Sequence, residues 1–190
     1  MTNGTLYDDV MPGSDDGDIF YGLGGNDTLL GAGGDDELRG GADDDSIVGG
    51  AGNDVIDGGL GDDRILGGDG FDWAVFSSSH AGGAPPAYGV TVDLRGQDVE
   101  PNHQGSATGS LGNDVLQDIE NVLGSLYADT IYGSSANNWI LTGGGADSVF
   151  GMDGDDVLVD NGDNNANSFL HGGTGSDFLE LREGSTGYGG

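Results

Sequence analysis

Aspartate recurs at every ninth residue over the first part of the chain. The series runs without a gap through Asp9, Asp18, Asp27, Asp36, Asp45, Asp54, Asp63 and Asp72. Glycines precede most of these aspartates, and an apolar residue such as Leu29 follows two positions later. Calcium takes about six to eight hard oxygen ligands, which carboxylates and backbone carbonyls supply. The residue types and their spacing therefore point to the binding of a hard cation.

Each nine-residue unit divides into a six-residue turn and three strand residues. Glycine provides the positive φ angles of a tight turn without steric cost. In the strand, one side chain points inward and its neighbours point outward, because side chains alternate along a strand. Two units make one coil with a turn at each edge, and a single coil cannot bury its inner face alone. We expect an all-β parallel β-roll, a right-handed β-helix or solenoid of nonapeptide repeats.

The unit follows the pattern G-G-x-G-x-D-x-U-x, in which U is apolar, as in GLGGNDTLL and GGAGNDVID. On these units the chain resembles the RTX (repeats-in-toxin) nonapeptide family of calcium-binding parallel β-helix proteins. The resemblance implies several Ca²⁺ ions, each held between two stacked turns by the sixth-position aspartate and turn carbonyls of both. The metal ligands that it implies are Asp9, Asp18, Gly25, Asp27, Gly34, Asp36, Asp45, Gly52, Asp54, Gly61, Asp63, Gly70, Asp72, Asp129, Gly145, Asp147, Gly154, Asp156 and Asp177.

Alternate aspartates are expected at opposite edges of the roll. One edge of the first block then holds Asp18, Asp36, Asp54 and Asp72, and the other holds Asp9, Asp27, Asp45 and Asp63. Some turns depart from the pattern, since Tyr7, Asp16 and Asp43 replace the third glycine and Asn138 replaces an aspartate. We expect the Tyr7 turn to be a cap. The Asp16 and Asp43 turns should form at some cost, because aspartate tolerates left-handed backbone better than most residues.

The charge balance excludes several classes of partner. The 190 residues carry 34 acidic and 4 basic side chains, a formal net charge of −30, and no cysteine. Such a chain is unsuited to nucleic acid or to anionic membranes, and it has no thiolates for metal centres or disulfides. It also lacks an apolar run long enough for a transmembrane helix and a classical signal peptide at its start. Because so much charge accompanies few large apolar residues, we expect the calcium-free chain to be disordered.

The nine-residue grid suggests four parts of the chain. These are 4–75, the first calcium-binding block; 76–123, an inserted strand-and-loop excursion with a spacer; 124–181, the second calcium-binding block; and 182–190, a tail resembling a cut end or linker. Within the middle part, 89–94 alternates as a strand, 109–117 returns to the grid, and 118–123 is the spacer. Residues 160–171 are three residues longer than one unit.

Several outward strand positions are apolar. In the first block they form a stripe, Leu30, Val48 and Leu66, and in the second block they include Tyr132, Phe150, Trp139, Leu141, Val157 and Val159. Exposed apolar stripes usually mark covered or contacted surfaces. We expect residues 76–108 to fold back over the stripe of the first block. The alternative is that it contacts flanking domains of a larger chain or a second copy.

No catalytic motif accompanies the repeats. The sequence has no H-E-x-x-H, G-x-S-x-G or P-loop pattern, and His80, His103 and His171 lack partners at a useful spacing. We therefore expect no enzyme activity. The resemblance implies a secreted bacterial module, exported by a type I system, that folds on binding Ca²⁺ outside the cell and serves as a structural, secretion-assisting region of a larger protein. The alternative is a segment of a surface adhesin, or the accessory tail of a secreted protease, lipase or epimerase.

Overall fold

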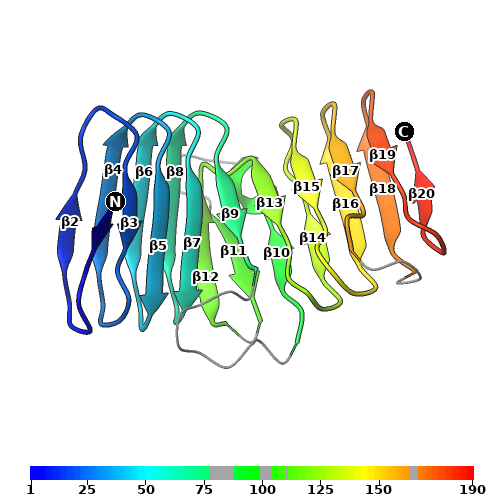
Figure 1. Ribbon diagram of the computed structural model, residues 1–190. Helices are drawn as coiled ribbons and strands as arrows, with labels where there is room; N and C mark the ends of the chain where they lie inside the picture. The colour runs from blue at the N-terminus through cyan, green and yellow to red at the C-terminus, as the bar shows by residue number, and fades with distance from the viewer. Residues whose placement is uncertain (78–87, 99–103, 110, 163–166) are drawn as a thin grey trace.

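The computed structural model describes residues 1–77, 88–98, 104–109, 111–162 and 167–190. In these ranges the chain winds as a solenoid through short strands that alternate between two facing sheets (Figure 1). Leu29 pairs with Ile47 in the next coil, so strands one coil apart are parallel neighbours. Two nonapeptide units therefore make one coil, which confirms the expected all-β parallel β-roll.

The two sheets run along the whole solenoid, with the N-terminus at one end and the C-terminus at the other (Figure 1). Sheet A contains, in spatial order, β1 (Thr2–Asn3), β3 (Ile19–Tyr21), β5 (Glu37–Ala42), β7 (Val55–Leu60), β9 (Trp73–Val75), β13 (Asn121–Leu123), β15 (Trp139–Leu141), β17 (Val157–Val159) and β19 (Phe178–Glu180). Sheet B contains β2 (Val10–Pro12), β4 (Thr28–Gly33), β6 (Ser46–Ala51), β8 (Arg64–Asp69), β12 (Asn113–Gln117), β11 (Gly105–Thr108), β10 (Thr91–Asp93), β14 (Thr130–Tyr132), β16 (Ser148–Asp153), β18 (Phe169–Thr174) and β20 (Thr186–Tyr188). A 3₁₀ helix, η1 (Arg95–Asp98), follows β10, and no helix in the described ranges could span a membrane.

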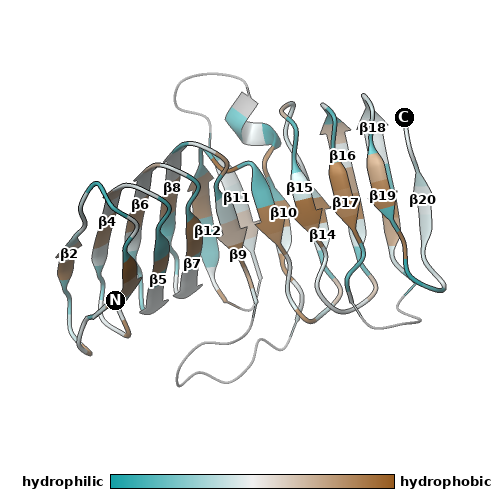
Figure 2. Cartoon of the chain, turned by 45° about the horizontal axis from the view of Figure 1, so that its top comes forward, coloured by the Kyte–Doolittle hydropathy of each residue, from teal (hydrophilic) through white to brown (hydrophobic). Residues whose placement is uncertain are grey.

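The core is a stack of inward side chains between the sheets. Leu38 and Ile56 in sheet A, and Ile47 in sheet B, are completely buried. Figure 2 shows the hydrophobic residues of the chain concentrated in the strands, with the turns more hydrophilic. Burial of one such side chain contributes about 1.5–3 kcal/mol. Each nonapeptide unit supplies only one inward side chain. The stability of the fold therefore depends on the stacking of successive coils and on interactions between their turns.

The predicted excursion lies inside the sheet, so the expected fold-back is wrong for its described part. Strand β10 pairs in parallel with β14, and β11 lies antiparallel between β10 and β12. Val92 and Leu94 are completely buried, since the alternating residues of 89–94 join the core. Leu30 of the first-block stripe remains 36% exposed. The other residues of the excursion, 78–87 and 99–103, lie outside the described residues.

Two other segments also belong to the solenoid. The predicted spacer, 118–123, contains β13, which pairs with both β9 and β15 and places Val122 in the core. The predicted tail, 182–190, contains β20, which pairs with β18 and has Gly187 at the inward position. The end of a sheet leaves backbone N–H and C=O groups unpaired, and β20 pairs with them although its inward residue is a glycine.

Candidate calcium sites

The sixth-position carboxylates form a ladder along each edge of the solenoid. Each Oδ1 accepts the backbone N–H of the equivalent residue one coil earlier, as from Asp27 to Asp45 at 2.8 Å. The same bond joins Asp36 to Asp54 at 2.9 Å on the opposite edge. This register brings the first-block aspartates together at the two edges expected from the sequence, and it links successive coils through side chains as well as strands.

The ladder continues through the middle of the chain by way of residues that were not among the predicted ligands. Asp63 donates its N–H to Asp114 Oδ1 at 3.1 Å, and Asp72 donates to Glu120 Oε2 at 2.9 Å. Glu120 stands two residues before the buried Val122, which is the spacing of every repeat aspartate to its inward residue. That spacing was the signal by which the sequence could have revealed it.

The second block carries a less regular ladder. Asp129 donates to Asp147 Oδ1 at 2.9 Å, and Asp156 donates to Asp177 Oδ1 at 3.1 Å. Asp147 instead donates to the hydroxyl oxygen of Ser168 at 3.2 Å. Ser168 lies within the lengthened unit 160–171, so at this edge a hydroxyl takes the place of a carboxylate.

The ladder aspartates differ in whether their second carboxylate oxygen, Oδ2, has a hydrogen-bond partner. In the described residues it is buried without a hydrogen-bond partner at Asp27, Asp36, Asp45, Asp54, Asp72, Asp147 and Asp156. A buried ionised oxygen without a partner costs several kcal/mol, unless a cation lies beside it. By contrast, Oδ2 accepts a backbone N–H at Asp9, Asp18, Asp129 and Asp177.

Glycine backbone surrounds these unpartnered oxygens. A Cβ placed on Gly22 would collide with Asp27 Oδ2 and with the carbonyl oxygen of Gly40 in the next coil. In the turn of Asp54, a Cβ on Gly49 would likewise meet Asp54 Oδ2. The first glycine of the repeat therefore keeps space beside the carboxylate and brings a carbonyl of the next coil to it. These oxygens fit a calcium ion.

The donor set also indicates which cation fits. No three carboxylate or imidazole groups of the described residues come close enough together to hold a metal ion by themselves. A cation beside Oδ2 must therefore take most of its ligands from backbone carbonyls. Calcium accepts such mixed oxygen ligands in flexible geometry, whereas transition metals favour nitrogen and sulfur.

The turn backbone follows the predicted glycine pattern. Positive φ angles between 91° and 157° occur at all the predicted fourth-position glycines, namely Gly25, Gly34, Gly52, Gly61, Gly70, Gly145 and Gly154. Asp43 adopts φ of 76° in place of glycine, as expected. Asp16 is not among the positive-φ residues, so the expectation of a strained glycine-like turn is wrong there.

Burial changes the acidity of the ladder. Burial, together with the charge of neighbouring carboxylates, raises the pKa of Asp45 to about 8 and that of Asp72 to about 7. Burial also raises the pKa of Asp147 and Asp156 to about 6. Without a cation, the carboxyl groups of the folded ladder therefore hold their protons to higher pH than a free aspartate does. A divalent ion beside Oδ2 reverses this preference.

The sequence matches the RTX calcium-binding nonapeptide repeat over residues 3–38, 12–47, 39–74, 123–158 and 161–185. The matched segments cover more than half of the chain and contain all seven aspartates with an unpartnered Oδ2. A comparison with curated proteins gives no match. The family binds several Ca²⁺ ions per repeat array. This chain belongs to the RTX calcium-binding nonapeptide repeat family and is a calcium-binding β-roll module.

Proposed function

We propose that this module folds when it binds calcium outside the cell and serves as a structural, secretion-assisting region of a larger secreted bacterial protein. The observation that carries the proposal is the row of buried Oδ2 atoms without a hydrogen-bond partner. A bound calcium ion would neutralise the buried negative charge of these carboxylates, whose Oδ2 atoms have no hydrogen-bond donor. Since the ligands come together only in the stacked coils, the free energy of calcium binding becomes free energy of folding.

The proposed ligands are ladder aspartates whose turns have a positive φ at the fourth position, together with the backbone of those turns. They are Asp27, Asp36, Asp45, Asp54, Asp63, Asp72, Asp147 and Asp156 with Gly25, Gly34, Gly52, Gly61, Gly70, Gly145 and Gly154. Each carboxylate has two roles in this arrangement. Its Oδ1 accepts an N–H of the preceding coil, and its Oδ2 faces the ion.

The location follows from calcium supply. Extracellular calcium modules bind at about 0.1–1 mM, so the chain stays unfolded where calcium is scarcer. An unfolded chain can pass a narrow export channel and fold after release. Type I secretion and an extracellular, bacterial location are proposed on this reasoning and on membership in the family.

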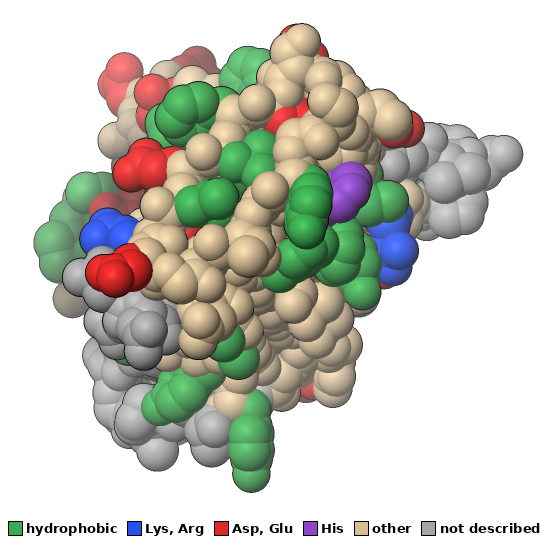
Figure 3. Space-filling model, turned by 90° about the vertical axis from the view of Figure 1, so that its right-hand side faces the viewer, with side chains coloured by type: hydrophobic (Ala, Val, Ile, Leu, Met, Phe, Trp, Pro, Cys, Tyr) green, Lys and Arg blue, Asp and Glu red, His purple; other side chains and the backbone are tan. Residues whose placement is uncertain are grey.

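The outward apolar faces are the proposed contacts with flanking domains of the larger chain or with a second copy. On sheet A, the rings of Trp73 and Trp139 lie 5.8 Å apart. On sheet B, Tyr132 stacks on Phe150 at 5.1 Å, and His171 continues this aromatic row. Figure 3 shows hydrophobic side chains gathered beside the histidine near the C-terminal end. An adhesin segment or the accessory tail of a secreted enzyme would use the same faces.

The proposed module has no catalytic role of its own. Among the described residues, His171 packs against the rings of Phe150, Phe169 and Tyr188. His80 and His103 lie outside the described residues. The net charge of −30 also disfavours nucleic acid as a partner and insertion into a membrane.

Far-UV circular dichroism during a calcium titration tests the proposal. The metal-free chain should give a coil spectrum, and calcium should produce a cooperative change to a β spectrum. Magnesium at the same concentrations is the control and should not replace calcium, because it demands a smaller octahedral site. A β-rich spectrum in EDTA at neutral pH would contradict folding upon binding.

A further inference from the structure

Four turns in the described part of the chain are built differently from the turns that have a positive φ at the fourth position. They span residues 5–9, 14–18, 125–129 and 134–138, and their second position holds Thr5, Ser14, Ser125 and Ser134. We call these the hydroxyl-closed turns. Turns with a positive φ at the fourth position are called open turns.

The hydroxyl-closed turn at 125–129 satisfies its carboxylate internally. Ser125 donates its backbone N–H to Asp129 Oδ2 at 2.7 Å and its hydroxyl to Asp129 Oδ1 at 2.7 Å. The same hydroxyl oxygen accepts the N–H of Tyr127 at 3.1 Å. Both carboxylate oxygens therefore have donors, and no cation is needed to offset their burial.

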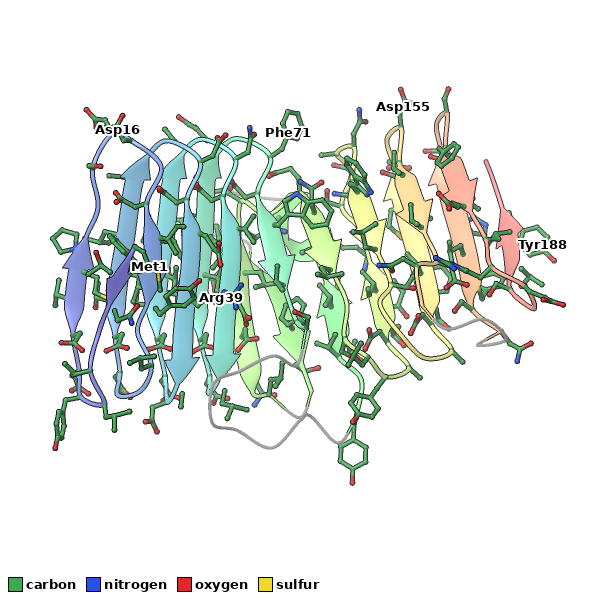
Figure 4. All side chains as sticks on the ribbon, viewed as in Figure 1. Met1, Asp16, Arg39, Phe71, Asp155 and Tyr188 are labelled. Carbon is green, nitrogen blue, oxygen red and sulfur yellow. The ribbon has the colours of Figure 1, made fainter. Side chains whose placement is uncertain are left out.

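The turn at 5–9 repeats this network near the N-terminus. Thr5 donates its N–H and its hydroxyl to Asp9 Oδ2 at 2.6 and 2.8 Å, and its Oγ1 accepts the N–H of Tyr7 at 3.2 Å. In the turn at 14–18, Ser14 donates to Asp18 Oδ2 at 2.9 and 3.0 Å. Figure 4 shows Asp16 of this second turn at the outer tip of its edge.

The fourth such turn uses a neutral amide in place of the carboxylate. Ser134 donates its N–H to Asn138 Oδ1 at 2.7 Å, and Asn138 Nδ2 donates to Ser134 Oγ at 3.2 Å. Asn138 Nδ2 also donates to the carbonyl oxygen of Glu120, one coil earlier, at 2.7 Å, so both polar atoms of the amide have partners. A turn of this build is complete without any negative charge.

Open turns direct the same backbone N–H elsewhere. In the turn of Asp27, the second-position N–H of Leu23 donates to the carbonyl oxygen of Gly40 in the next coil at 3.0 Å. Asp27 Oδ2 is consequently left without a partner. The fourth position differs too, since Tyr7, Tyr127 and Ala136 do not have the positive φ found in open turns.

We infer that the hydroxyl-closed turns take no calcium, and that the second-position hydroxyl selects between the two kinds of turn. This inference rests on the proposed binding of calcium by the open turns. Calcium is then confined to open turns. In each block, one ion-free coil of two hydroxyl-closed turns precedes the open turns whose aspartates have an unpartnered Oδ2, which lie within 22–72 and 142–156. The ion-free turns still carry the ladder, because Asp9 and Asp129 donate to Asp27 and Asp147 Oδ1 at 2.8 and 2.9 Å.

Converting a closed turn into an open one tests this inference. The full-length double variant Ser125→Gly/Tyr127→Gly creates the turn sequence GGLGAD, and it should bind one more calcium ion per chain than the wild type. Stoichiometry is measured by native mass spectrometry and by isothermal titration calorimetry at saturating calcium. An unchanged stoichiometry in the folded variant would overturn the inference.

The neighbouring closed turn offers a matched control. Ser134→Gly/Ala136→Gly opens that turn but leaves Asn138, so it should gain no ion; adding Asn138→Asp should then gain one. A wild type that binds no calcium at all would instead contradict the proposed function.

A measurement on the unaltered protein keeps the test decisive if a variant does not fold. In crystals of the calcium-loaded wild type, anomalous scattering should locate ions beside the Oδ2 atoms of Asp45 and Asp147. No signal should appear at the turns of Asp9, Asp18, Asp129 and Asn138. An ion in any of those turns overturns the inference.

Discussion

Asp36 donates its backbone N–H to Asp54 Oδ1 at 2.9 Å, although the two residues lie one full coil apart. The Oδ2 atoms of both residues are buried without hydrogen-bond partners. One carboxylate thus joins two coils and also leaves an oxygen for an ion. Stacking and calcium binding consequently depend on the same side chain, which explains why folding and loading should be coupled.

Replacement of a single ladder carboxylate should remove one site without removing the ladder bond. In Asp54→Asn, the amide oxygen can still accept the N–H of Asp36, but the charge beside the ion is lost. We expect one fewer calcium ion per chain and a calcium midpoint for folding raised about tenfold, or about 1.4 kcal/mol. Calorimetry and circular dichroism measure the two quantities. Asp15→Asn, at an exposed turn position, should alter neither.

Loss of inward packing should destabilise the roll even when calcium is saturating. Ile56 is completely buried between the sheets, so Ile56→Ala should lower the free energy of unfolding by about 2–5 kcal/mol. Urea unfolding in excess calcium measures the effect. The outward neighbour Val55 is 41% exposed, and Val55→Ala should cost about 0.5 kcal/mol or less. Equal losses in the two variants would contradict the assignment of the inward row.

Acid should partly replace calcium. The pKa of Asp45 is about 8 and that of Asp72 about 7 in the folded chain without metal, against 3.8 for an unperturbed aspartate. Because the folded state then binds more protons, this contribution to stability is fully present below about pH 4 and is lost as pH rises through 7 to 8.

Metal-free protein should therefore gain β structure when the pH is lowered from 8 towards 4, as measured by circular dichroism after removal of calcium. Protons should also compete with calcium, so the calcium midpoint should rise on acidification. A metal-free spectrum that does not change between pH 8 and pH 4 would be the opposing result.

The glycine beside each carboxylate should be far less replaceable than the glycine at the turn tip. A Cβ on Gly49 would collide with Asp54 Oδ2 and lie 2.7 Å from the carbonyl oxygen of Gly67. Gly49→Ala should therefore abolish one site and raise the calcium midpoint by about tenfold or more. In Gly24→Ala, the nearest atom is Leu6 Cδ2 at 3.9 Å, an ordinary contact, so the calcium titration should match the wild type.

The sequence by itself determined the coil and the edges on which the first-block aspartates lie. The nine-residue period places an inward residue such as Leu38 in each unit, and side-chain alternation admits only one inward position there. Aspartate every nine residues must then alternate between two edges. Gly25 and its equivalents were predictable for a local reason, since their backbone conformation excludes most side chains.

Only the tertiary structure decided where the middle of the chain pairs in the sheets and which turns satisfy their own carboxylates. Strands β10 and β11 lie inside sheet B, between β12 and β14, and they pair through backbone hydrogen bonds that no local pattern in 76–108 specifies. Ser125 was visible in the sequence, but its role depends on where its N–H points. That direction is set by the stacking of the coils, and it determines whether Asp129 has donors or needs an ion.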